Sequence, residues 1–185
     1  MRTWPLITAC VALLAAAIAV PANAIVVNGT VTGAPAVLTA AGVGSPTFNL
    51  TLNGVDQTPT YALPVSVVDA RGLAVGGGWN LTVTSTQFND GAGHTFPTTA
   101  STMTGVVPTC GASSTCTFPT NAVTNTNLAI PAAAVAPAAV KYENAATATG
   151  LGTNTITATI QVAVPANVFA GTYTSTVTVA IIAGP

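Results

Sequence analysis

Charge is the first thing that this sequence lacks. Among its 185 residues only three are Lys or Arg and four are Asp or Glu, so charged residues make up 4% of the chain. Proteins that bind nucleic acid or dock on anionic lipid need basic side chains to meet phosphates. The composition therefore argues against both kinds of partner. Polarity comes instead from Thr, Asn and Ser, which suit the exposed faces of β-strands.

Catalytic chemistry is the second absence. His94 is the only histidine, and it lies in a glycine-rich turn with no Gly-x-Ser-x-Gly element. No glycine motif cradles phosphates, and residues 89–91 are too sparse for a Ca²⁺ loop. The acids are scattered, which suits turn and ion-pair roles better than a glycosidase pair. We therefore predict a protein that is not an enzyme and that uses no cofactor or metal. The acidic residues are Asp56, Asp69, Asp90 and Glu143.

Long apolar runs are missing beyond the start of the chain, although half of the residues are hydrophobic and the mean hydropathy is +0.64. The opening segment has Arg2, an apolar core over 4–20 and an Ala-x-Ala end at Ala24, as a signal peptide does. A retained membrane anchor is the alternative, which Pro21 disfavours. We predict export with cleavage after Ala24, which leaves a single domain over 25–185 with no membrane span.

Cysteine is scarce as well, with three residues in the chain. Cys10 lies in the predicted signal peptide, which leaves Cys110 and Cys116 in the exported domain. A close pair in an exported protein predicts a disulfide that closes a small loop. A metal site is the alternative, but His94 alone adds too few ligands for one. We therefore expect a Cys110–Cys116 disulfide, worth roughly 2 kcal/mol by loop entropy.

What the sequence does have is a series of short β-strand patterns separated by Gly, Pro and Asn. Residues 155–164 alternate most clearly, with Ile, Ala and Val on one face and Thr and Gln on the other. The alanine-rich stretch 132–148 is broken by prolines, so we predict loop there, as in 33–46. The pattern predicts an all-β fold, an antiparallel β-sandwich of Ig-like, Greek-key type with Gly/Pro-rich loops. The predicted strands are 47–52, 63–68, 80–86, 101–107, 115–118, a short one near Leu128, 155–164 and 173–183, after a β-rich start at 24–32.

The stretch that leads into Trp79 has the most unusual local sequence. Asp69 and Arg71 are two of the few charges and are close enough to pair across a turn, which Gly72 follows. Three glycines, Gly76–Gly78, then precede Trp79, the largest apolar side chain of the predicted mature domain. One interpretation is a core tryptophan, with these glycines making room for its ring. The other is an aromatic platform that stacks on the face of a sugar.

A family resemblance bears on this choice. Residues 79–81 form a Trp-x-Leu motif behind an Asp-x-Arg-Gly turn and a glycine-rich loop. This arrangement resembles the first Trp-x-Leu motif of the WxL family of bacterial surface proteins. The end of the chain is similar too, with Ala-Gly-Thr-Tyr over 170–173 and a final Gly184-Pro185. Where the family normally carries a second Trp-x-Leu, this chain has Val179-Ala180-Ile181, so the second tryptophan is missing.

The resemblance implies a domain that attaches non-covalently to the cell wall from outside the cell, with peptidoglycan as its ligand. It also implies partnership with other surface proteins. Trp79, Asn80 and Leu81 would then be the ligand-binding residues. The residues with a structural role in the motif would be Asp69, Arg71, Gly72, Gly78 and Tyr173.

A structural subunit of a surface layer, filament or biofilm matrix is the alternative function. The strands predicted at 155–164 and 173–183 are long and carry no charge. Uncharged strand edges can pair with another copy, because they lack the lysines that usually prevent it. A module that adheres to other glycans is a third possibility, which the sequence does not separate from wall binding.

Overall fold

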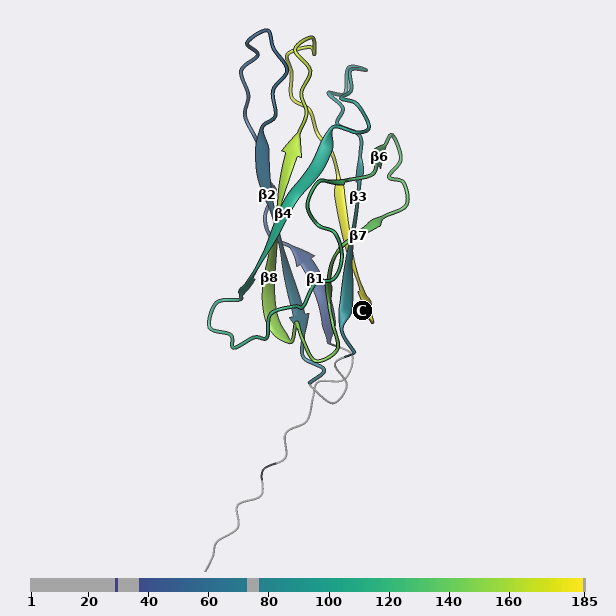
Figure 1. Cartoon of the computed structure of the whole chain (residues 1–185). Coiled ribbons are helices and arrows are strands. Elements are labelled where there is room, and N and C mark those ends of the chain that lie inside the picture. Colours follow the sequence, from purple (N-terminus) through teal and green to yellow (C-terminus); the bar gives the residue numbers. More distant parts are fainter. Residues whose placement is uncertain (1–28, 30–36, 73–76, 185) are drawn as a thin grey trace, which may run out of the picture. The chain divides into compact units, whose positions relative to one another are not determined.

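The computed structural model describes residues 29, 37–72 and 77–184, and those from 37 onward belong to one compact unit, Thr32–Pro185. The described residues form strands and loops with no helix, so the all-β prediction is confirmed (Figure 1). The predicted signal peptide, 1–24, lies outside the described residues, as does nearly all of the β-rich start. The strands are β1 (Leu38–Gly42), β2 (Thr60–Asp69), β3 (Trp79–Thr86), β4 (Ser101–Cys110), β5 (Leu128–Ala129), β6 (Ala132–Ala133), β7 (Val140–Ala145), β8 (Gly152–Val162) and β9 (Val177–Ala183).

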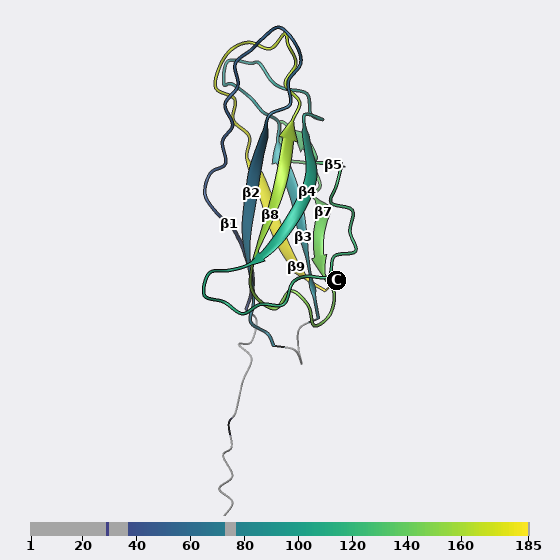
Figure 2. The same ribbon diagram turned by 60° about the vertical axis from the view of Figure 1, so that its left-hand side comes forward.

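One sheet has the strand order β1-β2-β8-β4-β5, and each neighbouring pair in it is antiparallel. β8 lies at its centre, between β2 and β4 (Figure 2). The alternation that the sequence predicts is present in β8. Ile156 and Ile160 are fully buried on one face, whereas Thr159 on the other face is exposed.

The second sheet is built around β3. β7 pairs antiparallel with β3 on one side and β9 pairs antiparallel with it on the other. β6 makes a short parallel pairing at Ser85 and Thr86, beyond the end of β7. Trp79, Leu81 and Val83 alternate along β3 and are fully buried.

Two buried clusters fill the domain. The main cluster takes side chains from both sheets, as a β-sandwich requires. A second cluster forms around Phe96, Ala100, Val162 and Val164, beyond one end of β8. Residues of the main cluster are Leu63, Val65, Val67, Trp79, Leu81, Val83, Met103, Ile130, Tyr142, Ala145, Ile156, Ala158 and Ile160.

The two lateral sides of the sandwich are built differently. On one side the chain passes from β5, which pairs with β4, to β6, which pairs with β3, so this segment joins the sheets. Ile130, between the two short strands, is 1% exposed. On the other side β1 and β9 lie next to each other, and each pairs with a single strand among the described residues. β1 and β9 are therefore the edge strands of their two sheets on this side.

Three strands form where loop was predicted: β1, β7 and the two-residue β6, which makes a short pairing with the end of β3. β1 lies within 33–46 and is made of small residues, but it pairs in register with β2 over its whole length. β7 lies within the alanine-rich stretch 132–148 and carries Tyr142, which is fully buried in the core. In both cases a neighbouring strand and the core supply the stabilisation that local propensity lacks.

Two predicted strands are absent from the structure. In 47–52, Phe48 and Leu50 do alternate inward and pack on the second cluster, but this segment has no strand partner. Residues 115–118 run as loop beside the start of β8, where Thr117 N donates to Leu151 O at 3.0 Å. Alternation alone therefore overpredicts strands, because a ladder also needs a partner.

Candidate functional site

The turn after β2 is held by an ion pair between Asp69 and Arg71, as the sequence predicts. Arg71 Nε donates to Asp69 Oδ1 at 2.8 Å, and Arg71 Nη2 donates to Asp69 Oδ2 at 2.7 Å. Arg71 Nη2 also donates to the carbonyl oxygen of Gly78 at 2.9 Å, which ties the turn to the start of β3. The Asp69 side chain is fully buried, and its hydrogen bonds raise the pKa of Arg71. The pair therefore fixes the chain that leads into Trp79.

Two glycines in this region have the same left-handed backbone but different surroundings. Gly72 and Gly78 both have a φ of +78°. Among the described residues, a Cβ at Gly72 would meet nothing within 4 Å, whereas a Cβ at Gly78 would overlap the carbonyl oxygen of Ala145. Gly78 is therefore required both for its conformation and for space, and Gly72 only for its conformation. Gly76 lies outside the described residues.

Trp79 lies in the core, with an exposed fraction of 0%. Its indole N–H donates to the carbonyl oxygen of Gly150 at 3.1 Å. A Cβ at Gly150 would lie 2.6 Å from Trp79 Nε1, so room for the ring comes from Gly150 and not from Gly77 or Gly78. The structure thus shows the core interpretation of Trp79. The ring has no face open to a sugar.

The other two residues of the Trp-x-Leu motif are also enclosed. Leu81 is fully buried beside Trp79 in the main cluster. Asn80 points to the opposite face of β3 and is 5% exposed. Its side-chain amide N–H donates to the carbonyl oxygen of Gly184, just beyond β9, while its Oδ1 is buried without a partner among the described residues. The motif therefore joins β3 to the core and to the end of β9.

The remaining predicted residue, Tyr173, lies at the opposite end of the sandwich. Asp69 pairs with Gly152 at one end of β8, and Tyr173 packs on the cluster beyond Val162 at its other end. We call the first end, which holds residues 69–72, 77–79 and Gly150, the motif end. We call the second the loop end, because three loops, 43–59, 87–100 and 163–176, gather there (Figure 1).

The loops of the loop end are tied together by backbone hydrogen bonds and by aromatic rings. Gln57 and Val164 exchange two backbone bonds, and so do Asn89 and Thr174. Rings then stack across the loops in a continuous series. The ring pairs, which are stacked, edge-on or tilted, are Tyr61–Phe48, Phe48–Phe88, Phe88–Phe96 and Phe96–Tyr173.

An open groove of about 450 Å³ lies on the loop end. One wall holds Tyr173, whose ring stacks on Phe96 with centroids 4.2 Å apart. The other holds Phe169, which is 63% exposed and stacks on His94 with centroids 3.9 Å apart. Asn167 and Thr95 add an amide and a hydroxyl to the lining.

His94 is fixed by its own loop. Its Nδ1 lies 2.5 Å from Asp90 Oδ2, and its backbone N–H donates to Asp90 Oδ1 at 3.0 Å. The hydrogen bond with His94 lowers the pKa of Asp90, although partial burial opposes this. Residues 90–94 therefore form a closed turn that presents the imidazole ring to Phe169.

The groove was not predicted from the sequence, where only Tyr173 was singled out. Its residues come from two loops that are more than 65 residues apart in the chain. One available signal was that aromatic residues adjoin turn residues, as in Phe88-Asn89 and Phe96-Pro97. This pattern places rings at loop bases, but it does not say which loops meet.

With this geometry in place, comparison with known proteins is decisive for the family. The model of the family described as "WxL domain surface cell wall-binding" matches residues 38–185, about four fifths of the chain. This chain belongs to the WxL family. The match begins at the first residue of β1 and covers every described strand, so the chain is a cell wall-associated surface domain. No curated protein and no solved structure shows significant similarity to the chain. The described part of this WxL domain holds no helix with the length and apolar character that a membrane crossing needs.

The degenerate second motif of this WxL domain keeps apolar side chains at the positions of β9 that face the core. Val179 and Ile181 stand where the family normally has its second Trp-x-Leu, and both pack partly buried on the main cluster. Ile181 pairs directly with Leu81, and Val179 with Val83. Val179 and Ile181 thus keep the inward face of β9 apolar while β9 pairs with β3.

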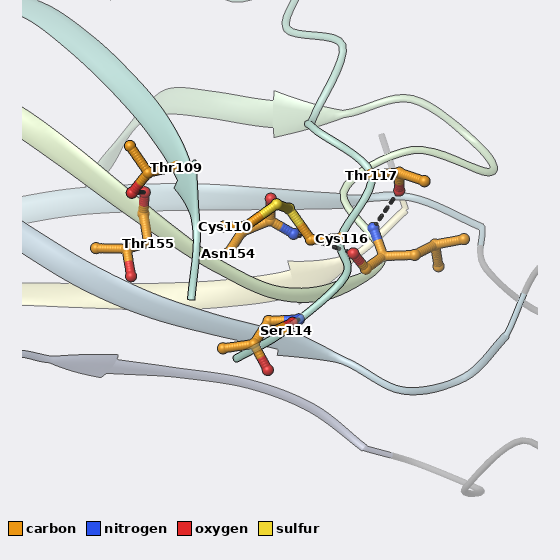
Figure 3. The surroundings of a disulfide bond; sticks show 9 residues. Thr109, Cys110, Ser114, Cys116, Thr117, Asn154 and Thr155 are labelled. Carbon is orange, nitrogen blue, oxygen red and sulfur yellow. Dashed lines mark hydrogen bonds between the residues drawn. A yellow bond between two sulfur atoms is a disulfide. The ribbon is translucent and has the colours of Figure 1, made fainter. Parts of the chain in front are cut away.

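The WxL domain contains the predicted disulfide between Cys110 and Cys116 (Figure 3). It closes a loop after β4, and Gly111 N donates to Thr153 O at 2.8 Å in β8. Leu151 N donates to Thr117 Oγ1 at 2.8 Å just before β8 begins. The disulfide therefore packs this loop against the motif end.

One acidic residue of the WxL domain is buried without a cationic partner. Glu143 of β7 is 2% exposed, and Asn125 Nδ2 donates to its Oε2 at 2.9 Å. Burial raises the pKa of Glu143 to about 7, and the hydrogen bond from Asn125 opposes that rise. Next to it, Asn144 N donates to Asn121 Oδ1 at 3.1 Å. These contacts hold residues 121–125 against β7.

Proposed function

We propose that this WxL domain is an exported, non-catalytic protein that holds itself non-covalently to peptidoglycan. The observation that carries the proposal is the family match over 38–185, together with the intact turn and Trp-x-Leu motif within it. Cleavage of residues 1–24 by the export machinery would release the domain outside the cell. Mass spectrometry of the protein recovered outside expressing cells should then find Ile25 as its first residue.

The roles of the acidic residues support a non-catalytic domain. Asp69 forms an ion pair with Arg71, and Asp90 accepts a hydrogen bond from the backbone N–H of His94 in its turn. Asp56 Oδ1 accepts a hydrogen bond from Ala166 N at 2.8 Å, which ties two loops of the loop end together. Glu143 is buried beneath Asn125. Each carboxylate thus stabilises a turn or a loop.

The low charge of the domain suits a neutral glycan better than an ionic polymer. Thr, Asn and Ser side chains can exchange hydrogen bonds with sugar hydroxyl and N-acetyl groups without charge neutralisation. Each such site would bind weakly, and many copies on one wall would raise the overall retention. Binding of this kind should depend little on ionic strength.

A pull-down on purified, protein-free peptidoglycan sacculi tests the proposal. The protein used is residues 25–185, and the comparison is the same protein after reduction and thermal denaturation. Retention of the folded protein at both low and high salt is the expected result. If the folded protein stays in the supernatant at every salt concentration, peptidoglycan is not its ligand.

A structural subunit remains the second candidate function, but only one of its two strands still supports it. β8 is central in its sheet, so the expectation that 155–164 offers a free edge is wrong. β9 does offer one. Gly184 N donates to Gly78 O at 3.1 Å, so the alternating ladder turns the backbone groups of Val177, Val179 and Ile181 away from β3. No charge protects this edge.

Light scattering of residues 25–185 at increasing concentration tests the subunit function. Growth of large particles without wall material, abolished by Ala180→Lys on the exposed face of β9, would favour assembly through this edge. A species that remains monomeric at high concentration would contradict it.

A further inference from the structure

We propose that the loop-end groove is the glycan site of this domain, with a pyranose ring of the peptidoglycan strand stacked on Phe169. The inference rests on the proposed function, because it names the surface through which the domain would meet the wall. It moves the contact from the motif end to the opposite end of the sandwich. Trp79 then becomes a residue that builds the fold.

Phe169 combines exposure with a fixed position. It is 63% exposed, yet one face of its ring is covered by His94 at a centroid distance of 3.9 Å and an interplanar angle of 22°. Its carbonyl oxygen accepts a hydrogen bond from the Tyr173 hydroxyl at 3.1 Å. A ring that is already held in place loses little conformational entropy when a ligand stacks on it. The uncovered face is therefore a prepared platform.

The support beneath the platform reaches the core. Tyr173 stacks on Phe96, which is 3% exposed, and Gln87 Nε2 donates to the carbonyl oxygen of Phe96 at 2.6 Å. His94 is anchored by Asp90, as described above. An exposed phenylalanine on an unsupported loop would be an ordinary surface residue, whereas the ring of this one stacks on an anchored histidine, and its carbonyl oxygen is bonded to a tyrosine that packs on Phe96.

The chemistry of the lining selects the class of ligand. Aromatic rings stack on the C–H faces of sugars, and the amide of Asn167 and the hydroxyl of Thr95 can bond to sugar hydroxyl and N-acetyl groups. The titratable side chains His94 and Asp90 near the groove bond to each other. A neutral amino-sugar polymer fits this lining, whereas a polyanion would find no cluster of cations. The groove volume, about 450 Å³, lies within the usual range for small-ligand sites.

Two variants and one matched control test the site in the sacculus pull-down. Phe169→Ala and Asn167→Ala alter the groove, while Phe118→Ala removes an equally large ring that is 56% exposed at the motif end. Phe118 O accepts from Gly150 N, which places this control beside Trp79. All three should unfold at the wild-type temperature, because the residues are exposed. We expect about tenfold weaker retention for Phe169→Ala and unchanged retention for Phe118→Ala.

A nuclear magnetic resonance titration with the N-acetylglucosamine tetramer gives the second readout. Trp79 is the only tryptophan in 25–185, so its indole N–H yields a single resolved signal that reports on the motif end. The proposal expects shifts in the backbone amide signals of Thr95, Asn167 and Phe169, with the Trp79 indole signal unmoved.

The outcomes separate the two proposals. If wild type is retained on sacculi and Phe169→Ala is retained equally, the domain binds the wall but the groove is not its site. Shifts at the Trp79 indole without shifts at the loop end would also overturn the groove. If wild type is not retained yet the tetramer shifts the loop-end signals, the groove is a sugar site and peptidoglycan is the wrong ligand. Neither retention nor shifts would overturn both.

Discussion

The two ends of this sandwich use their unusual residues in opposite ways. At the motif end, Asp69, Arg71 and Trp79 stand out in the sequence, and the structure encloses them. At the loop end, Phe169 attracts little notice in the sequence, and the structure exposes it beside a groove. The sequence features that identify the family are thus those that hold the strands together.

The residues by which the family is recognised therefore need not be the residues that bind its ligand. The Trp-x-Leu motif at the start of β3 fills the core, where Trp79 bonds to Gly150. The Asp69–Arg71 pair fixes the turn before β3. The identity of such buried residues is restricted, because a closely packed core accepts few substitutions. An exposed surface that stacks on a sugar can be built from several residue types, so its residues form no distinct motif in a single sequence. Four predictions test how far the two ends differ.

The largest expected effect is at the motif end. Trp79→Ala should lower the free energy of unfolding by about 3–5 kcal/mol, because it empties a fully buried site and leaves the Gly150 carbonyl without its donor. Urea denaturation followed by circular dichroism measures the loss. Trp79→Phe serves as a milder variant that keeps most of the ring. A loss below 1 kcal/mol for Trp79→Ala would mean that the ring does not organise the core.

Next in size is the contrast between two glycines. Gly78→Ala should cost about 3 kcal/mol, since the methyl group would overlap the Ala145 carbonyl and φ is +78°. Gly72→Ala has the same φ but open space, so it should cost only about 1 kcal/mol. Both losses of unfolding free energy can be measured from the midpoints of denaturant titrations, provided that the m-values are equal. Equal costs for the two variants would show that conformation alone, and not enclosure by β7, makes Gly78 necessary.

A smaller effect should appear as a pH dependence. Burial raises the pKa of Glu143 to about 7 from an ordinary 4.5, so the folded state holds a proton that the unfolded state releases. Stability is then greatest below about pH 4.5 for this group and falls as the pH rises to about 7, by on the order of 2 kcal/mol. Glu143→Gln keeps an acceptor for Asn125 and should remove that slope. An unchanged slope in this variant would assign the pH dependence to other groups.

The smallest stability effect should be at the loop end. Phe169→Ala should change the free energy of unfolding by less than about 0.5 kcal/mol, because the ring is 63% exposed. The same variant is expected to weaken retention on sacculi. Phe169→Ala should therefore lose retention in the pull-down without losing thermal stability, whereas Trp79→Ala should lose both. A large loss of stability in Phe169→Ala would remove the distinction between the two ends.

Much of the fold could be predicted from the sequence where a strand shows its own pattern. β2, β3, β4 and β8 lie where strands were predicted, with alternation in β3 and β8, and the disulfide and the Asp69–Arg71 pair follow from short sequence distances. β1 and β7 escaped prediction because their small or mixed residues become strands only beside β2 and β3. The candidate site escaped as well, since Thr95 and Phe169 meet only after the loops have been tied together.

The sequence by itself determined the class of fold, the family, the disulfide and the charged turn, because each rests on residues that are near one another in the chain. Only the tertiary structure decided that Trp79 is enclosed by Gly150, that β8 is central while β9 is an edge, and that aromatic loops meet at the far end. The physical reason is that burial and edge exposure are properties of neighbours. Which segments become neighbours depends on packing across the whole domain.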